Sequence, residues 1–248
     1  MKSIRLIRRE EQQEMPLFDG AFVENKPIPF PDIHGTQAYS NLFYWANLQA
    51  KRTGEFPLHE HKGFEIMTFV MKGSVEHFDT ASMVWTPLQE GAVQVIQAGS
   101  GVEHAERIQK GTQLFQIWFD PDFSESLKLQ AEYKDYSKDT FLTKTADGIK
   151  ETVYIFEGGP VNCLSQGLGI KKMSFEKGKQ SLSFDMESIY SIYLLEGELE
   201  FEEQVMYKDD FLICKDLDSL AIDVKKTAVL FIVQTPNLVT YSRFMDRY

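Results

Sequence analysis

The same pattern of strand, glycine turn and strand occurs once in each half of this chain. Residues 67–76 read MTFVMKGSVE, and residues 191–200 read SIYLLEGELE. In both, an apolar run meets a turn glycine and continues in alternating apolar and polar residues, as in a half-buried strand. Such a repeat predicts two β-domains of similar plan.

Short stretches rich in Val, Ile, Phe, Tyr and Thr make up most of the remaining sequence. We expect strands at residues 64–71, 92–97 and 113–119, each bounded by turn-forming residues. This pattern is typical of a sandwich or barrel, so the predicted fold class is all-β. Because Asp120-Pro121-Asp122 should end strand pairing, we place a boundary there. The predicted parts are a first domain at 1–122, a short helical or irregular connector at 123–137 and a second domain at 138–248.

Composition excludes several classes of protein. The chain has 248 residues, of which 43% are hydrophobic, enough for two domain cores. Its net charge of -11 argues against a nucleic-acid binder, since phosphate contacts need clustered Lys and Arg. We see neither a signal peptide nor an apolar run approaching the roughly 20 residues of a membrane span, so we expect a cytoplasmic protein. Cys163 and Cys214, which form no CxxC motif, are expected to be reduced thiols.

The histidines are concentrated in the first half of the chain. There are five, none lies after residue 104, and two i, i+2 pairs stand out: His59 with His61, and His104 with Glu106. Side chains two residues apart on a strand project from the same face. The second pair follows a glycine-rich turn at residues 98–101, which permits sharp bends. Three neutral imidazoles and one carboxylate form a candidate ligand set for one divalent metal ion.

Glu65 is the ambiguous member of this group. It has the same parity as His59 and His61 along one extended segment, so we expect all three to face one side, together with the apolar Met67 and Phe69. A polar cluster on such an interior face needs hydrogen-bond partners or a metal. Glu65 can be a ligand or can accept a hydrogen bond from a ligating imidazole, and we favour the second role.

Each histidine also has a simpler interpretation. An isolated His-x-His pair is more often a chance pair on a solvated strand, and only the later His-x-Glu pair favours the metal site. His77 fits a hydrogen-bonded strand or loop residue better than a ligand. His34 belongs to no partner pattern.

The second half of the chain has no histidine at the corresponding positions. Aligning Gly197 with Gly73 places three other residues where His59, His61 and Glu65 stand: Ser183, Asp185 and Ile189. Aligning Asp210 with Gly91 places two others at the later ligand positions: Asp223 and Lys225. We therefore expect the first domain to carry the chemistry and the second, lacking metal ligands, to be structural or regulatory.

Three segments carry a resemblance to a known family. They are residues 59–65 (HEHKGFE), 73–79 (GSVEHFD) and 94–106, which end in AGSGVEHAE. Together with the rest of residues 54–119 and the connector motif AEY at 131–133, they resemble the pirin family of bicupins. One departure is Glu60, where the family usually has proline. The second half resembles the family in its plan alone, so the family's partner surfaces are not carried over.

The resemblance implies two cupin-type β-sandwich or barrel domains in tandem, each a double-stranded β-helix. It also implies one Fe(II) ion at the positions that match the family's ligands: His59, His61, His104 and Glu106. Ligand type alone allows Mn, Ni, Cu or Zn as well. These four ligands leave two positions open on an octahedral ion.

Some pirins act as quercetin 2,3-dioxygenases, which implies O₂ and a small-molecule substrate, a flavonol or a related enol. Glu106 or a nearby carboxylate would then accept the substrate's hydroxyl proton. The alternative function is a non-enzymatic, iron-binding redox sensor that binds a protein partner. A metal-dependent isomerase or decarboxylase is a third candidate, because the cupin scaffold hosts many chemistries.

Overall fold

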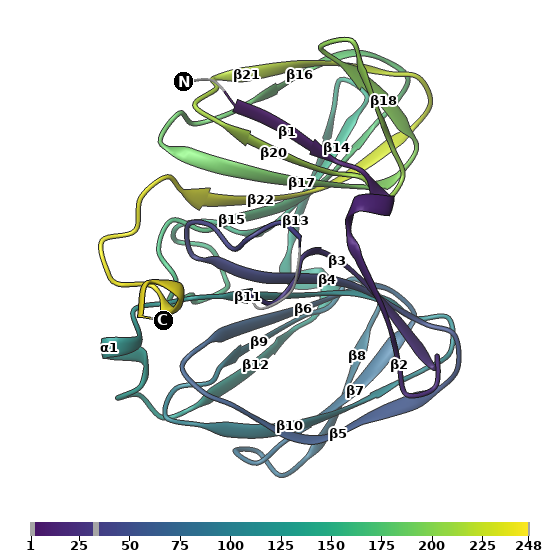
Figure 1. The fold of residues 1–248 in the computed structure, drawn as a ribbon. Helices are drawn as coiled ribbons and strands as arrows, with labels where there is room; N and C mark the ends of the chain where they lie inside the picture. Colours follow the sequence, from purple (N-terminus) through teal and green to yellow (C-terminus); the bar gives the residue numbers. More distant parts are fainter. Residues whose placement is uncertain (1–2, 32–34, 248) are drawn as a thin grey trace. The chain divides into compact units, whose positions relative to one another are not determined.

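The computed structural model describes residues 3–31 and 35–247, so His34 lies outside the described residues. The chain is built of antiparallel sheets with short helical turns (Figure 1), which confirms the predicted all-β class. It divides into two compact units: a first β-unit of residues 12–140, 163–165 and 240–248, and a second of residues 1–11, 141–162 and 166–239. Within the described ranges, no helix is long and apolar enough to cross a membrane.

Two sheets make up the first β-unit. The larger has, in spatial order, β12 (Glu132–Tyr136), β9 (Val93–Gln97), β6 (Glu65–Lys72), β11 (Gln113–Phe119), β4 (Leu42–Ala50), β3 (Phe22–Ile28) and β2 (Gln13–Leu17). The smaller has β5 (Gly54–His61), β10 (Val102–Ile108), β7 (Ser74–Asp79) and β8 (Trp85–Gln89). Val70 and Leu114 of the larger sheet pack with Val75 and Ile108 of the smaller in one buried cluster. Removing these side chains from water stabilises the two-layered structure.

The second β-unit also has two sheets. The larger contains β1 (Ser3–Ile7), β20 (Phe211–Lys215), β17 (Ser188–Glu196), β22 (Ala228–Pro236), β15 (Gly169–Phe175), β14 (Ile149–Ile155) and β13 (Leu142–Ala146). The smaller contains β16 (Gly178–Ser183), β21 (Ser219–Val224), β18 (Glu198–Phe201) and β19 (Gln204–Tyr207). Position by position, this order matches that of the first unit, as the sequence repeat predicts. The place of β12, which follows β11 along the chain, is taken in the second unit by β1.

The two turn glycines at the centre of the repeat have the same backbone conformation. Gly73 has φ 80° and Gly197 has φ 92°, a region that favours glycine. A Cβ atom at Gly197 would lie 2.0 Å from the carbonyl oxygen of Thr227. No other residue fits this turn without moving the backbone beside it.

Strand register after these turns corrects one alignment made from the sequence. The ladder pairs Val75 with Ile108 in the first unit and Leu199 with Val224 in the second. Counting back along β10 and β21 from these pairs, His104 and Glu106 correspond to Leu220 and Ile222. The alignment through Gly91 and Asp210 gave the wrong positions for the second unit, Asp223 and Lys225. Leu220 and Ile222 are buried in the apolar core of the second unit.

Residues 54–72 do not form one extended segment. The strand β5 ends at His61, and β6 begins at Glu65 in the other sheet. Gly63, with φ 79°, lies in the turn between them, where its position leaves no room for a side chain beside Phe123. The expectation that Glu65 shares a face with His59 and His61 is therefore wrong, because parity is not conserved across the turn.

The predicted connector, residues 123–137, holds more structure than expected. It contains a one-turn helix, α1 (Phe123–Ser126), whose N-cap Asp122 accepts a hydrogen bond from the Ser124 amide. It then forms β12, which pairs with β9 at the edge of the larger sheet. Short 3-10 turns occur at Arg9–Glu11, Lys138–Thr140 and Phe244–Arg247. The domain boundaries 1–122, 123–137 and 138–248, as limits of independently folding domains, stay a prediction.

Candidate metal centre

The strands β5 and β10 bring the first three predicted ligands together. They are antiparallel, and His104 lies directly opposite His59, while Val102 lies opposite His61. Opposite residues share a face in an antiparallel ladder, and so do residues two apart on one strand. His59, His61 and His104 therefore project from the same face of the smaller sheet.

An irregularity in β5 fixes the orientation of His59. The register shifts between His104 and Glu106, because two residues of β5, Pro57 and Leu58, face one residue of β10. Proline has no backbone N–H to give to a ladder, which suits it to a bulge. The carbonyl oxygen of Pro57 lies 2.8 Å from His59 Nδ1. Since a carbonyl can only accept, Nδ1 carries the proton and Nε2 of His59 keeps its lone pair.

The three imidazoles form a compact cluster. Among the described residues they are the one group of three or more His, Cys, Asp or Glu side chains whose ligand atoms all lie within 4.8 Å of one another. His61 Nε2 is 2.8 Å from His104 Nε2. His104 is fully buried, and His59 and His61 are half-buried. These three side chains can hold a metal ion.

Burial keeps two of these imidazoles, His61 and His104, neutral. The pKa of His61 is lowered to about 3, mainly by burial and to a smaller extent by the neighbouring His59. The pKa of His104 is lowered far below its ordinary value. Burial is the main cause, and the neighbouring imidazoles contribute less: His61, His59 and His77. A neutral imidazole has a lone pair, which is the form that binds a metal ion.

Glu106, the predicted fourth ligand, projects from the same face of β10 as His104 but is not a member of the compact group. It is buried, and its Oε2 accepts a hydrogen bond of 3.4 Å from Gln116 Nε2. The indole N–H of Trp118 donates to the other side of that amide, Gln116 Oε1, at 3.1 Å. Because an indole only donates, the amide must turn its NH₂ group toward Glu106.

The remaining oxygen of Glu106, Oε1, is buried without a hydrogen-bond partner. Burial, followed by the carboxylate of Glu24, raises the pKa of Glu106 to about 7. An orphaned buried carboxylate oxygen on the same face of β10 as His104 suits a cation, which would replace the lost hydration. The donor set therefore fits a divalent metal ion.

A buried ion pair was not anticipated from the sequence. Lys26 Nζ lies 2.9 Å from Glu24 Oε2, and both side chains are buried. The hydroxyl of Tyr44 donates to the same oxygen at 3.3 Å. Glu24 and Lys26 lie two residues apart on β3, so both side chains face the same side of the strand, and this spacing of opposite charges is the signal that sequence reasoning missed.

Glu65 has a different environment from the one expected. Its carboxylate accepts hydrogen bonds from Gln97 Nε2 at 3.1 Å and from the backbone amides of Leu164 and Ser165 at 2.9 and 3.1 Å. None of these donors is an imidazole. Glu65 thereby ties residues 163–165 to the first β-unit, and the reduced thiol of Cys163 lies in this segment.

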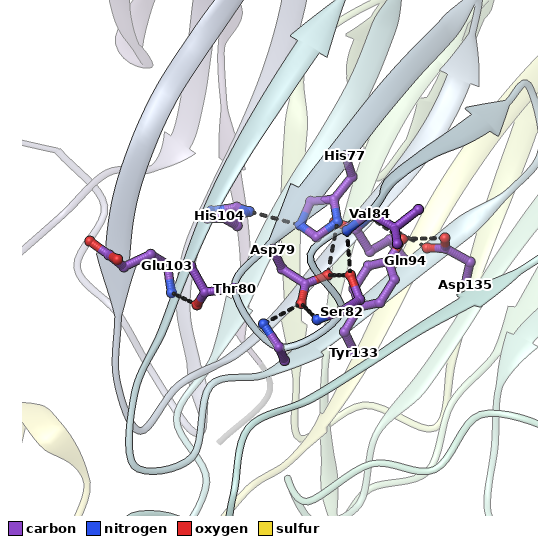
Figure 2. Close-up of polar contacts among 11 residues, drawn as sticks. His77, Asp79, Thr80, Ser82, Val84, Gln94, Glu103, His104, Tyr133 and Asp135 are labelled. Carbon is purple, nitrogen blue, oxygen red and sulfur yellow. Dashed lines mark hydrogen bonds and ion pairs between the residues drawn. The ribbon is translucent and has the colours of Figure 1, made fainter.

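His77 contacts the cluster from the neighbouring strand β7. Its Nε2 lies 3.2 Å from His104 Nδ1, and its ring is fully buried (Figure 2). The sequence interpretation of His77 as a hydrogen-bonded strand residue agrees with this contact, but its partner could not be foreseen. Trp118 was also missed: its ring lies 4.7 Å from that of His61, edge to face.

Known proteins resemble this chain in two ways. A model of the Pirin family matches residues 30–119. A putative quercetin 2,3-dioxygenase of Pasteurella multocida is 39% identical over 69 residues, which cover 27% of this chain and 29% of that protein. The quercetin 2,3-dioxygenase of Escherichia coli K12 is 37% identical over 70 residues, covering 27% and 30%. The matched segments span about a third of these curated relatives.

The likeness in structure extends over the whole chain. The bacterial pirin YhhW from Escherichia coli, solved in complex with nickel(II), superposes with a TM-score of 0.76 at 19% identity, covering 95% of this chain and 100% of that one. At this identity the likeness shows the fold alone. The predicted tandem-cupin architecture and the predicted resemblance to pirins are both confirmed.

Proposed function

We propose that this chain, whose residues 30–119 match a model of the Pirin family, is a metal-dependent dioxygenase acting on a flavonol or a related enol. The observation that carries the proposal is the convergence of three imidazoles from β5 and β10, with a buried carboxyl group of β10 on the same face. The relatives named quercetin 2,3-dioxygenase supply the reaction class.

In this proposal His59, His61 and His104 hold the metal through their Nε2 atoms. Glu106 would be the fourth ligand or the group that receives the substrate's hydroxyl proton. Fe(II) is the metal we propose, and Mn, Ni, Cu and Zn suit the same donors. When bound, such an ion supplies Lewis-acid activation of an enol hydroxyl and, if redox-active, reactivity toward O₂.

Two features of the chain support a flat, aromatic substrate. Trp118 is half-buried and stands edge-on to His61 at the cluster. It belongs to a group of aromatic rings with Phe43 and Phe64, at 6.5 and 5.6 Å between ring centroids. These two buried rings support the half-buried indole of Trp118, which can make stacking or edge contacts with a flavonol. The buried position of Glu106 keeps its proton exchange away from bulk water.

The test begins with elemental analysis of protein purified from its native host. Metal-free protein is then reloaded with each candidate ion and mixed with quercetin, and flavonol absorbance and O₂ consumption are followed together. We expect matched loss of both with the native metal and none for His61→Ala. Glu60→Gln, an exposed change on the same strand, should leave turnover intact. Metal-loaded protein that consumes neither flavonol nor other enols would overturn the enzymatic proposal.

A further inference from the structure

Behind the imidazole cluster, a line of polar groups runs from β10 to the turn that follows β7. His104 Nδ1 faces His77 Nε2 at 3.2 Å, and the second ring nitrogen of His77, Nδ1, lies 3.8 Å from Asp79 Oδ2 (Figure 2). All three side chains are buried. Among the described residues, no polar atom lies within hydrogen-bond distance of His77 Nδ1, so the Asp79 carboxylate at 3.8 Å is the charged group that it faces.

Asp79 has a firmly held carboxylate. Its Oδ1 accepts hydrogen bonds from the backbone amides of Ala81 and Ser82, at 2.8 and 2.7 Å. Its Oδ2 accepts the Ser82 hydroxyl at 2.7 Å. Three donors on two oxygens identify Asp79 as an acceptor, so the nitrogen of His77 that faces Oδ2 is favoured to carry a proton.

Neighbours on the edge strand hold His77 in place. The ring of Tyr133 stacks on His77 with centroids 4.5 Å apart and planes 14° from parallel. Tyr133 is in turn hydrogen-bonded to Asp135, and Gln94 Nε2 donates to both at 3.4 Å. The stack limits rotation of His77 and keeps Nε2 directed at His104.

These contacts determine which nitrogen donates and which accepts in each hydrogen bond between these side chains. If Asp79 favours a proton on His77 Nδ1, neutral His77 has its lone pair on Nε2 and must accept a proton from His104 Nδ1. Neutral His104 then has its lone pair on Nε2, the atom that faces His61 at 2.8 Å. In the opposite arrangement, a His77 lone pair would face the carboxylate, and His104 Nε2 would be blocked by a proton.

We propose that His77 and Asp79 are positioning residues that hold His104 in the tautomer whose Nε2 lone pair points into the imidazole cluster. The inference rests on the proposed metal site for its functional meaning, but the tautomer exists in the metal-free chain and can be observed there. Groups that orient a ligating imidazole commonly change metal affinity by about 10–100-fold when they are removed.

The first measurement needs no variant. Nitrogen-15 NMR of the imidazole rings in metal-free protein, at a pH where the rings are neutral, distinguishes protonated from unprotonated nitrogens. We expect protons on Nδ1 of both His77 and His104. A proton on His104 Nε2 in the wild type would overturn the proposal, whether or not the protein binds metal.

Asp79→Asn provides the sharpest variant. The two backbone amides that bond Oδ1 require an oxygen there, so the amide NH₂ group must occupy the Oδ2 position and face His77 as a donor. We expect both tautomers to reverse in the NMR spectrum and the dissociation constant for Ni(II) to rise by about 10–100-fold. Unchanged tautomers in a folded Asp79→Asn protein would contradict the assigned role of Asp79.

His77→Phe and His77→Gln form a matched pair. Phenylalanine keeps the ring volume and the stack on Tyr133 but removes both nitrogens, whereas the glutamine oxygen can still accept from His104 Nδ1. We expect weaker Ni(II) binding in His77→Phe and substantial rescue in His77→Gln, with thermal unfolding reporting whether each variant folds. Equal Ni(II) affinity in the two folded variants would overturn the role of His77. Failure of the wild type to bind Ni(II), Zn(II) or Fe(II) would instead count against the proposed function and leave the NMR result to decide the inference.

Discussion

The Nε2 atoms of His61 and His104 lie 2.8 Å apart, although the residues are 43 positions apart in the sequence. Two imidazole nitrogens at about 2.0–2.1 Å from one ion, at right angles or in a tetrahedron, are about 3 Å apart. This pair of nitrogens therefore has nearly the spacing of two ligands on one ion, and the ligand atoms of all three imidazoles lie within 4.8 Å of one another.

Removing a ligand should abolish tight metal binding. For His59→Ala and His61→Ala we expect the dissociation constant for Ni(II) or Fe(II) to rise by at least about 100-fold, the upper end of what is lost when a group outside the ligand set is removed. Titration calorimetry measures this change directly. Glu60→Gln, which alters only an exposed neighbour, should bind like the wild type, and normal affinity in His61→Ala would remove His61 from the site.

Glu106→Gln should have opposite effects on stability and on metal binding. The folded-state pKa of Glu106, about 7, lies above its ordinary value of 4.5, so stability associated with this carboxyl is present at low pH and is lost as pH rises through 7. At pH 8 the metal-free variant should be more stable than the wild type by on the order of 1–3 kcal/mol, with little difference at pH 4. Urea unfolding at both pH values tests this. Metal affinity of the variant should fall, and a variant destabilised at pH 8 would contradict the assignment.

Acid should destabilise the metal-free protein through its buried histidines. The pKa of His61 falls from 6.5 in the unfolded chain to about 3 in the fold, and burial lowers that of His77 to about 4. Below pH 6.5 the unfolded chain therefore binds more protons than the folded chain, so stability falls as pH falls toward 4. As pH falls, the wild type should lose more stability than His61→Gln. The difference should be below about 1.4 kcal/mol per pH unit, since His61 is partly exposed. Parallel pH profiles would contradict this prediction.

Gly63 should be far less replaceable than Gly111. Both have positive φ, 79° and 84°, so alanine at either position costs about 1–2 kcal/mol of backbone strain. A Cβ at Gly63 would also lie 2.6 Å from Phe123 Cε2, whereas nothing lies within 4 Å at Gly111. Denaturant unfolding should show Gly63→Ala less stable than Gly111→Ala by a further ~1–3 kcal/mol. Equal losses would mean that the contact with Phe123 relaxes freely.

The strand β1 should be required for the second β-unit. It pairs with β20 over its whole length, and Asp210 accepts hydrogen bonds from Arg8 Nη1 at 3.0 Å and the Arg9 amide at 2.9 Å. Deleting residues 1–9 leaves β20 as an unpaired edge. Hydrogen exchange should show lost protection in β20, while β9, which keeps β12 as its neighbour, serves as the internal control. Unchanged exchange in β20 would contradict this requirement.

Much of this architecture was predictable because local signals agreed with one another. The repeat around Gly73 and Gly197 predicted two units of one plan, and the two i, i+2 pairs predicted that His59, His61 and His104 meet. Both inferences depend on strand periodicity and turn chemistry, which are encoded within a few residues. The predicted strand at 113–119 has the bounds observed for β11.

The wrong predictions concern features that depend on which strands pair across long distances in the sequence. The break at Gly63 moved Glu65 to another sheet, and only the strand register revealed that Leu220 and Ile222 occupy the second unit's ligand positions. The contact of His77 with His104 depends on which strand lies beside β10, and no local pattern specifies that neighbour. The same holds for β1, whose partner strand lies in the other half of the chain.

This placement of β1 has a consequence for synthesis of the chain. During translation, residues 3–7 leave the ribosome long before residues 211–215 exist, at roughly 5–20 residues per second. The first β-unit, whose strands span residues 13–136, can assemble before the partner strand of β1 has been synthesised. A strand without its neighbour exposes unpaired backbone groups, so residues 3–7 are open to pairing with other chains until β20 emerges.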